Sequence, residues 1–148
     1  MPISDYCLSE VVTIGPTENI VAAANLMRDQ HVGCLVVVEG NKPVGILTDR
    51  DIVRGVVTTV KDPELTTVEE VMTGDLVTVT QNTGVFDAIS IMCDDGVRRL
   101  PVLDAEGHLV GIIALDDLLL LLGTALVNLA SISTTERHRE KEKARIEV

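Results

Sequence analysis

The chain has 148 residues and a formal net charge of -11, with 12 lysines and arginines against 23 aspartates and glutamates. Its length fits one domain or two tightly packed half-size modules. Apolar residues make up 46% of the chain, which is enough to fill a core. The surplus of acidic residues argues against DNA or RNA as a partner, because nonspecific binding to phosphates needs a basic surface. With only Tyr6 and Phe86 as aromatic residues, the chain also lacks a stacking platform for single-stranded nucleic acid.

The three cysteines, Cys7, Cys34 and Cys93, are far apart and show neither a CxxC spacing nor histidine partners at zinc-site spacing. This pattern favours a cytoplasmic protein with reduced thiols and no metal. The N-terminus shows no signal peptide. The apolar stretch from Leu118 to Ile132 is interrupted by polar residues and is shorter than the roughly 20 residues of a membrane helix, so we expect no membrane partner.

An internal repeat organises the chain. Residues from Val12 align with those from Val77 at an offset of 65, which becomes 66 from Val44 and Val110 onward after a one-residue insertion. Most identities between the halves fall at core-type positions. A repeated supersecondary unit of this kind determines the fold class.

Each half contains the same predicted elements in the order β-α-β-β-α. In the first half, a short strand over 11–14 precedes a helix whose N-cap is Thr17 or Asn19. Apolar strands over 35–38 and 44–47 follow around a turn, and a second helix ends the half. The pattern predicts an α+β fold of two packed repeats.

The second half begins with a predicted strand over 76–79 and a helix capped by Asn82 or Thr83. Between the halves, a proline interrupts the chain within 61–63, and 66–72 resembles a short helix with a hydroxyl cap and an acidic first turn. Such a short, structured connection favours halves that pack together.

After Asp117 the pattern is purely helical. One apolar stripe is formed by Leu118, Leu122, Ala125, Leu129 and Ile132, and it is widened by Leu119, Leu126 and Ala130. This stripe packs within its own module or forms a dimer interface. The charged tail after Thr134 prolongs the helix or frays. We divide the chain into repeat 1 (7–60), a linker with a short helix (61–75), repeat 2 (76–122), and a C-terminal helix with a charged tail (123–148).

The motif Gly45-Ile-Leu-Thr-Asp-Arg-Asp51 places a hydroxyl and a carboxylate three residues apart at a strand end, and 111–117 is a decayed copy. Thr48 and Asp51 together could hold the two hydroxyls of a ribose. The alternative is structural, with Thr48 capping the following helix and Asp51 lying in its first turn.

Two β-α-β-β-α repeats, each with a G-h-x-T/S-x-x-D element after the third strand, resemble a CBS domain pair, or Bateman module. The resemblance covers roughly residues 7 to 122, and 71–73 with 77–79, and 99–102, are similar to further phrases of the family. It implies two repeats related by a pseudo-twofold axis, with two clefts between them. In this family the clefts commonly bind adenosyl ligands such as AMP, ADP, ATP or S-adenosylmethionine.

The resemblance implies a nucleotide-binding first cleft. Thr48 and Asp51 would hold the ribose, Val77 and Val97 would flank adenine, and Arg98 or Arg99 would neutralise phosphate. The full predicted set is Ile46, Thr48, Asp51, Leu76, Val77, Val97, Arg98, Arg99 and Pro101.

A second cleft would use Val12, Val32, Gly33, Cys34, Ile112 and Asp117. It is expected to be weaker, because Ala114 lacks the hydroxyl and Gly33-Cys34 stand where the first cleft has two arginines. We therefore expect one competent site per chain, or a second site that prefers a less charged ligand.

The predicted function is regulatory. The module would bind AMP, ADP or ATP between its repeats and signal through rearrangement of a homodimer or an effector protein. A sensor of S-adenosylmethionine or NAD is one alternative, and a ligand-free interaction scaffold using the leucine-rich C-terminal helix is another. An enzyme with a catalytic cofactor is not expected, since no P-loop or nucleophile-base pair is recognisable. The sequence leaves open the identity of the ligand, the pathway and the dimer geometry.

Overall fold

The computed structural model describes residues 1–8 and 10–146. The first of its two compact units runs from Met1 to Ala114, and the second begins at Leu115. The first unit contains two three-stranded sheets, with strand orders β1-β2-β3 and β4-β5-β6. This duplicated sheet-and-helix arrangement confirms the predicted α+β class.

Repeat 1 builds its sheet from a parallel pair, β1 with β2, and an antiparallel pair, β2 with β3. α1 begins where Asn19 Oδ1 accepts a 2.9 Å hydrogen bond from Ala22 N, so Asn19 is the N-cap, one of the two predicted candidates. The elements are β1 (Thr13–Ile14), α1 (Ile20–Gln30), β2 (Cys34–Glu39), β3 (Lys42–Thr48), α2 (Asp49–Ile52) and the π-helical turn η2 (Val53–Val57).

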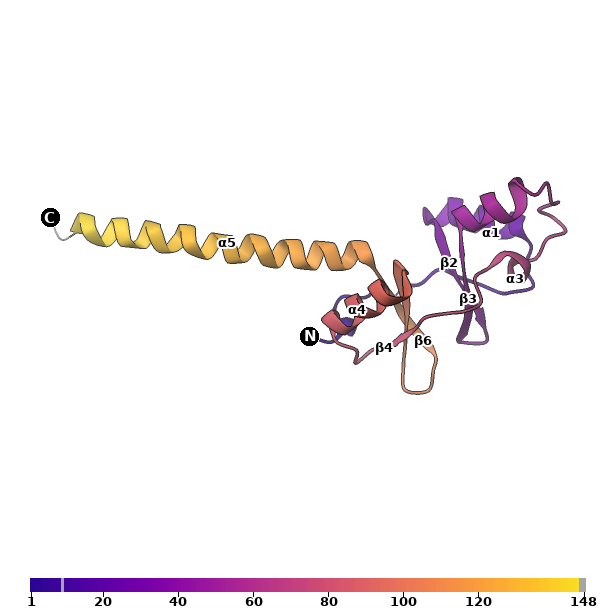
Figure 1. The fold of residues 1–148 in the computed structure, drawn as a ribbon, viewed down its shortest axis with the longest axis horizontal. Helices are drawn as coiled ribbons and strands as arrows, with labels where there is room; N and C mark the ends of the chain where they lie inside the picture. Colours follow the sequence, from indigo (N-terminus) through magenta and orange to yellow (C-terminus); the bar gives the residue numbers. More distant parts are fainter. Residues whose placement is uncertain (9, 147–148) are drawn as a thin grey trace. The chain divides into compact units, whose positions relative to one another are not determined.

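Repeat 2 has the same topology, and Figure 1 shows the two sheets with α1 and α4 in separate halves of the unit. Its elements are β4 (Val79–Thr80), α4 (Val85–Asp95), β5 (Arg99–Leu103) and β6 (Leu109–Ala114). The prediction of Asn82 or Thr83 as the N-cap of α4 is wrong, because Gly84 occupies this position. The Thr83 hydroxyl is instead used by the preceding strand, where it accepts a 3.2 Å bond from Thr80 N.

The two repeats exchange the segments that precede them. α3 (Val68–Val71), which leads into repeat 2, packs on repeat 1, where Val68 N donates to Glu18 O at 2.8 Å. The N-terminal 3-10 turn η1 (Ile3–Asp5) occupies the equivalent place on repeat 2, where Ile3 N donates to Thr83 O at 2.9 Å. The linker and the N-terminal residues therefore tie the repeats into one unit.

The cores of the repeats are built from equivalent aliphatic residues. In repeat 1, α1, α3 and one face of the sheet enclose Ile14, Ile20, Ala23, Met27, Leu35, Val37, Leu47 and Val68. The buried counterparts in repeat 2 are Val79, Val85, Ala88, Met92, Leu100, Val102, Ile113 and Ile3. Each pair keeps the offset seen in the sequence, so the repeat encodes two copies of one core.

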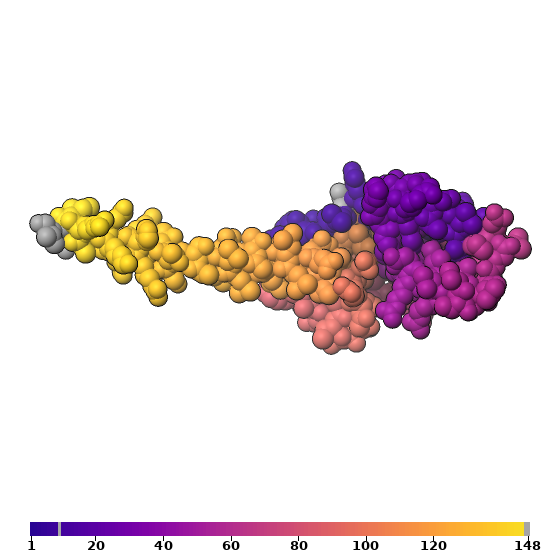
Figure 2. Space-filling view, turned by 90° about the horizontal axis from the view of Figure 1, so that it is seen from above, coloured from indigo at the N-terminus to yellow at the C-terminus, as the bar shows by residue number. Residues whose placement is uncertain are grey.

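α5 (Leu115–Ile146) forms the second unit as one uninterrupted helix. The predicted boundary between repeat 2 and the C-terminal helix, at 122–123, falls inside it, since Gly123 does not break the helix. The charged segment after Thr134 continues the helix through Ile146, while residues 147–148 lie outside the described part of the chain. Figure 2 shows the side chains of α5 in orange to yellow.

By length and composition alone, α5 is long and apolar enough to cross a membrane, with a mean hydropathy of 1.7 over its most apolar window. One such helix is weak evidence for a membrane span, because the core helix of a soluble protein and a signal sequence pass the same test. Core helices of soluble proteins are mostly buried, whereas 6% of this window of α5 is buried.

Candidate functional site

The Thr48-Asp51 element lies where β3 ends and α2 begins. Thr48 Oγ1 accepts from Asp51 N at 3.2 Å, and Asp51 Oδ2 accepts from Thr48 N at 2.9 Å, which together form a reciprocal capping box. The Thr48 hydroxyl also donates to Asp51 Oδ2 at 2.8 Å. The capping role that the sequence offered as the alternative to ribose binding is therefore present.

Capping does not use the whole carboxylate. Both bonds to Asp51 end on Oδ2, and among the described residues no hydrogen bond reaches Oδ1. The capping box fixes the rotamer of Asp51 and leaves one oxygen to accept from a ligand. A structural cap and a binding role are thus compatible at this strand end.

A backbone bridge brings the linker against β3. Ile46 N donates to Thr73 O at 3.0 Å, and Thr73 N donates to Ile46 O at 2.9 Å. Gly45 permits this approach, because a Cβ there would lie 2.9 Å from Thr73 O and closer still to Met72 Sδ. The equivalent bridge in repeat 2 joins Leu8 and Ile112, again beside a crowded glycine, Gly111.

These segments enclose a cavity of about 260 Å³ between the repeats. β3 and α2 contribute one wall, the linker before β4 a second, and the turn from α4 into β5 a third. The lining residues are Ile46, Thr48, Asp51, Thr73, Asp75, Leu76, Val77, Val97, Arg98 and Arg99. Ile46 and Thr48 share one face of β3 because side chains alternate along a strand, and Leu47 between them faces the core.

The charged groups of the cavity balance one another. Asp51 and Asp75 supply two carboxylates, and Arg98 and Arg99 supply two guanidinium groups. Apolar side chains form most of the remaining lining. Such a cavity suits a ligand with an apolar planar part, hydroxyl groups and an anionic group.

The structure brings the predicted first-cleft residues together, with one exception. All but Pro101 line the cavity. Pro101 lies within β5, paired in register with Ile112, and is buried in the sheet. The sequence prediction missed Thr73 and Asp75. In the repeat these positions are equivalent to Leu8 and Glu10, and Thr73 reaches the cavity through its backbone bridge to Ile46.

Cys34 begins β2 and pairs in register with Thr48. Burial raises the pKa of its thiol; the charge of Arg99 acts in the opposite direction, and Asp51 and Asp49 raise it further. Although predicted for the second cleft, Cys34 is therefore close enough to the first cavity to sense its charges. A raised pKa makes the thiol a poor nucleophile.

The residues predicted for the second cleft line no part of this cavity. Val12 O accepts from Val36 N, Gly33 O accepts from Asp49 N, and Val32 packs against the repeat 1 core. Ile112 is engaged by the Leu8 bridge, and Asp117 belongs to α5, in the other unit. A weaker second site remains a prediction.

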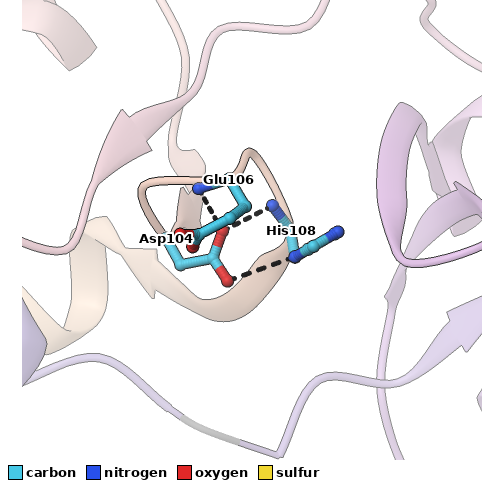
Figure 3. A network of polar contacts seen from close by, with 3 residues as sticks. All are labelled: Asp104, Glu106 and His108. Carbon is cyan, nitrogen blue, oxygen red and sulfur yellow. Dashed lines mark hydrogen bonds and ion pairs between the residues drawn. The ribbon is translucent and has the colours of Figure 1, made fainter.

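Asp104, Glu106 and His108, in the β5-β6 hairpin, could each offer one ligand atom to a metal ion, and these atoms lie within 4.8 Å of one another. Figure 3 shows that the Asp104 carboxylate already serves the turn, accepting from the amides of Glu106 at 2.9 Å and His108 at 2.8 Å. The His108 amide is the main cause of a lowered Asp104 pKa. Turn formation accounts for this cluster.

Comparison with known families identifies the duplicated unit. The CBS domain matches twice, over residues 3–58 and 68–123. The chain belongs to the CBS-domain family. The two matches include η1 and α3, the segments that the repeats exchange.

Similar CBS proteins include one from Bacillus subtilis, the CBS domain-containing protein YhcV, which is 40% identical over 78% of this chain and 81% of its own length. The Uncharacterized protein MK0525 of Methanopyrus kandleri is 36% identical over 79% of this chain, but that match covers only 60% of its length. The hexameric CBS-CP12 protein of bloom-forming cyanobacteria superposes with a TM-score of 0.72 at 30% identity, covering 80% of this chain and 66% of its own.

CBS pairs are regulatory modules that often bind nucleotides, and proteins that contain them commonly form oligomers. The stand-alone relatives are named as CBS-domain or uncharacterized proteins, which is consistent with a regulatory rather than an enzymatic role. Stand-alone CBS-domain proteins are generally soluble.

Proposed function

We propose that this CBS pair is a non-enzymatic cytoplasmic sensor that binds an adenosyl ligand, of the AMP, ADP or ATP type, in the cavity between its repeats. The observation that carries the proposal is the lining itself. Thr48 and Asp51 come from one repeat, and Val97, Arg98 and Arg99 come from the other. The family's usual ligand class requires this combination of hydroxyl acceptors, apolar walls and cations.

The ribose would bind at Asp51 Oδ1, which accepts no hydrogen bond from the described residues. A carboxylate oxygen accepts from a ribose hydroxyl with a charge-assisted bond, which contributes about 1.5 to 3 kcal/mol. Val77 and Val97 offer apolar contact to the base. Arg99 and Arg98 would bind phosphate through their planar guanidinium groups.

Signalling would depend on the fact that both repeats contribute residues to the cavity lining. A ligand that touches both repeats favours the arrangement in which both sets of contacts are made, and it shifts the equilibrium by its difference in affinity between arrangements. A second copy of the chain or an effector protein would read that shift. Solution scattering with and without saturating ligand measures it, and identical profiles together with unchanged partner affinity would contradict this step.

Thermal unfolding with AMP, ADP, ATP, NAD and S-adenosylmethionine tests the binding proposal. Ligand at about 100 times Kd adds roughly 2.7 kcal/mol of stability, which raises the Tm of a chain of this length by about 5 to 10 °C. Asp51→Ala should abolish the rise, and Asp117→Ala should leave it unchanged. A 2′-deoxy analogue of the active nucleotide should bind about tenfold more weakly, because one ribose hydroxyl is lost.

No Tm rise with any of the five ligands would overturn the proposal and favour the interaction scaffold. The observation that supports that alternative is the exposed leucine-rich face of α5. Replacing Arg98 and Arg99 by alanine separates the two functions. A sensor loses affinity for phosphorylated ligands, whereas a scaffold retains its partner affinity.

A further inference from the structure

Pro101 lies in the central strand of the repeat 2 sheet, because β5 stands between β4 and β6. Proline has no backbone amide hydrogen, so in a central strand it removes a hydrogen bond from the ladder, and it is found mainly on edge strands. The equivalent residue of repeat 1 is Val36, which has an amide hydrogen. The two repeats therefore differ by one backbone donor at this position.

In repeat 1, that donor joins the first strand to the second. Val36 N donates to Val12 O at 3.1 Å. The parallel ladder begins at the same place, with Thr13 paired to Val36 and Ile14 paired to Val37. The sheet of repeat 1 therefore uses the carbonyl of Val12.

In repeat 2, the equivalent carbonyl has no such donor. Val77 is the counterpart of Val12, and Pro101 cannot donate to it. The ladder between β4 and β5 accordingly begins one residue later than its counterpart, with Val79 paired to Val102. Among the described residues, no hydrogen bond reaches the amide or the carbonyl of Val77.

Val77 is also part of the cavity lining. By its equivalence to Val12, its carbonyl points toward the next strand of its sheet, β5, and Arg99 at the start of β5 lines the same cavity. The amide and the carbonyl of one strand residue point toward the same neighbour. Val77 therefore offers a donor and an acceptor side by side, and a half-buried backbone pair of this kind calls for a partner.

We propose that Pro101 is a positioning residue for base recognition, because it leaves the Val77 carbonyl and amide available to bind N6 and N1 of adenine. The inference rests on the proposed function and names the base that the adenosyl site selects. Adenine carries a donor at N6 next to an acceptor at N1, which complements a carbonyl next to an amide. Hypoxanthine and guanine carry an acceptor at position 6 and a donor at N1, so both contacts become repulsive.

The same comparison separates the two clefts without reference to their side chains. Val12 O already accepts from Val36 N, so a base in the second cleft would have to compete with a hydrogen bond of the sheet. Selection of adenine through this backbone position is therefore expected in the first cleft alone.

Pro101→Val tests the proposal on the full chain, because it restores the donor with the side chain that repeat 1 has there. Pro43→Leu is the matched control: Pro43 pairs with Val38 in repeat 1 as Leu109 pairs with Leu103 in repeat 2, and it does not line the cavity. Calorimetric titration with AMP and with IMP compares the variants with the wild type. The wild type and Pro43→Leu should bind AMP about tenfold more tightly than IMP.

In Pro101→Val, the affinity for AMP should fall about tenfold and the affinity for IMP should change little, because the Val77 carbonyl is now used by the sheet. A purely structural role of Pro101 would alter stability and leave the AMP-to-IMP ratio unchanged. Hydrogen exchange followed by NMR checks the two amides involved. The amide introduced by Pro101→Val should exchange slowly, and AMP, but not IMP, should slow exchange of the Val77 amide in the wild type.

Equal affinities of the wild type for AMP and IMP would overturn this inference while leaving the adenosyl site in place. So would an unchanged AMP-to-IMP ratio in a Pro101→Val protein whose new amide is protected, or a Val77 amide that AMP does not protect. Absence of binding by every adenosyl ligand would instead overturn the proposed function, and this inference with it.

Discussion

Thr48 and Asp51 hold each other at the start of α2 through hydrogen bonds in both directions, at 2.8 Å from hydroxyl to carboxylate and 3.2 Å from amide to hydroxyl. The same pair lines the cavity between the repeats. One local motif therefore stabilises a helix start and orients a binding group.

Thr48→Ala should lower both stability and ligand affinity. Loss of an N-cap hydroxyl costs about 0.5 to 2 kcal/mol, and Asp51 also loses the hydroxyl that fixes its rotamer. Thr67→Ala is the matched control, because Thr67 caps α3 against Glu70 and does not line the cavity. Chemical denaturation and the nucleotide-induced Tm rise measure the two effects. Equal loss of the Tm rise in both variants would mean that Thr48 acts through stability alone.

Asp75→Asn should strengthen binding of phosphorylated ligands. It removes one of two carboxylates that share the cavity with Arg98 and Arg99, and repulsion between unit charges 4 Å apart is about 1 kcal/mol even in water. The gain should be about fivefold for ATP and smaller for AMP, which carries less charge. Calorimetric titration compares the two, with Glu10→Gln, the equivalent position before β1, as control. Equal affinities of the wild type and Asp75→Asn for ATP would place the phosphates away from Asp75.

The first-cleft residues were predicted from the resemblance to CBS pairs, and all of them except Pro101 line the cavity. The repeat added a comparison between the two clefts. The offset of 65 places the α4-β5 turn, with Arg98 and Arg99, at the position that Gly33-Cys34 occupy in repeat 1, so the two clefts can be compared residue by residue. Thr73 and Asp75 were missed because they enter through a backbone bridge to Ile46, which carries no side-chain signature. Cap positions also depend on backbone geometry. The N-cap of α4 is therefore Gly84, and not Asn82 or Thr83 as predicted.

The residues that end α1 and α4 offer a test of backbone strain. His31 has φ 54° and Gly96 has φ 65°, both in the left-handed region, at equivalent positions of the two repeats. His31→Gly should stabilise the protein by roughly 0.5 to 1 kcal/mol, since glycine adopts this conformation without a Cβ penalty. Gly96→Ala should destabilise it by about 1 to 2 kcal/mol. Urea midpoints measure both changes, and shifts of the same sign would show that side-chain contacts outweigh the backbone.

Glu70 makes stability depend on pH. Hydrogen bonds from the Thr67 amide and then the Thr67 hydroxyl lower the pKa of its carboxyl from the usual 4.5. A carboxyl with a lowered folded-state pKa stabilises the protein above the unfolded pKa, and this contribution is lost as pH falls through the folded value. The stability difference between wild type and Glu70→Gln should therefore be constant at neutral pH and shrink below pH 4.5. A stability difference that does not shrink below pH 4.5 would contradict this role of Glu70.

Gly45→Ala should weaken both the fold and the binding site. Its Cβ would lie 2.9 Å from Thr73 O, a backbone atom that cannot rotate away, so the linker must move from β3. Overpacking of this kind costs about 1 to 3 kcal/mol. The displaced linker carries Thr73, Asp75, Leu76 and Val77 out of the cavity lining, so nucleotide affinity should fall as well.

Gly74→Ala is the control for that change, because a Cβ at Gly74 would meet nothing within 4 Å. Unfolding midpoints and calorimetric titration of the two variants separate local crowding from a general effect of alanine. A Gly45→Ala protein with wild-type stability and affinity would show that the linker can bind ligand without its backbone bridge to Ile46. Loss of affinity in Gly45→Ala but not in Gly74→Ala would show that ligand binding depends on the backbone bridge between the linker and β3.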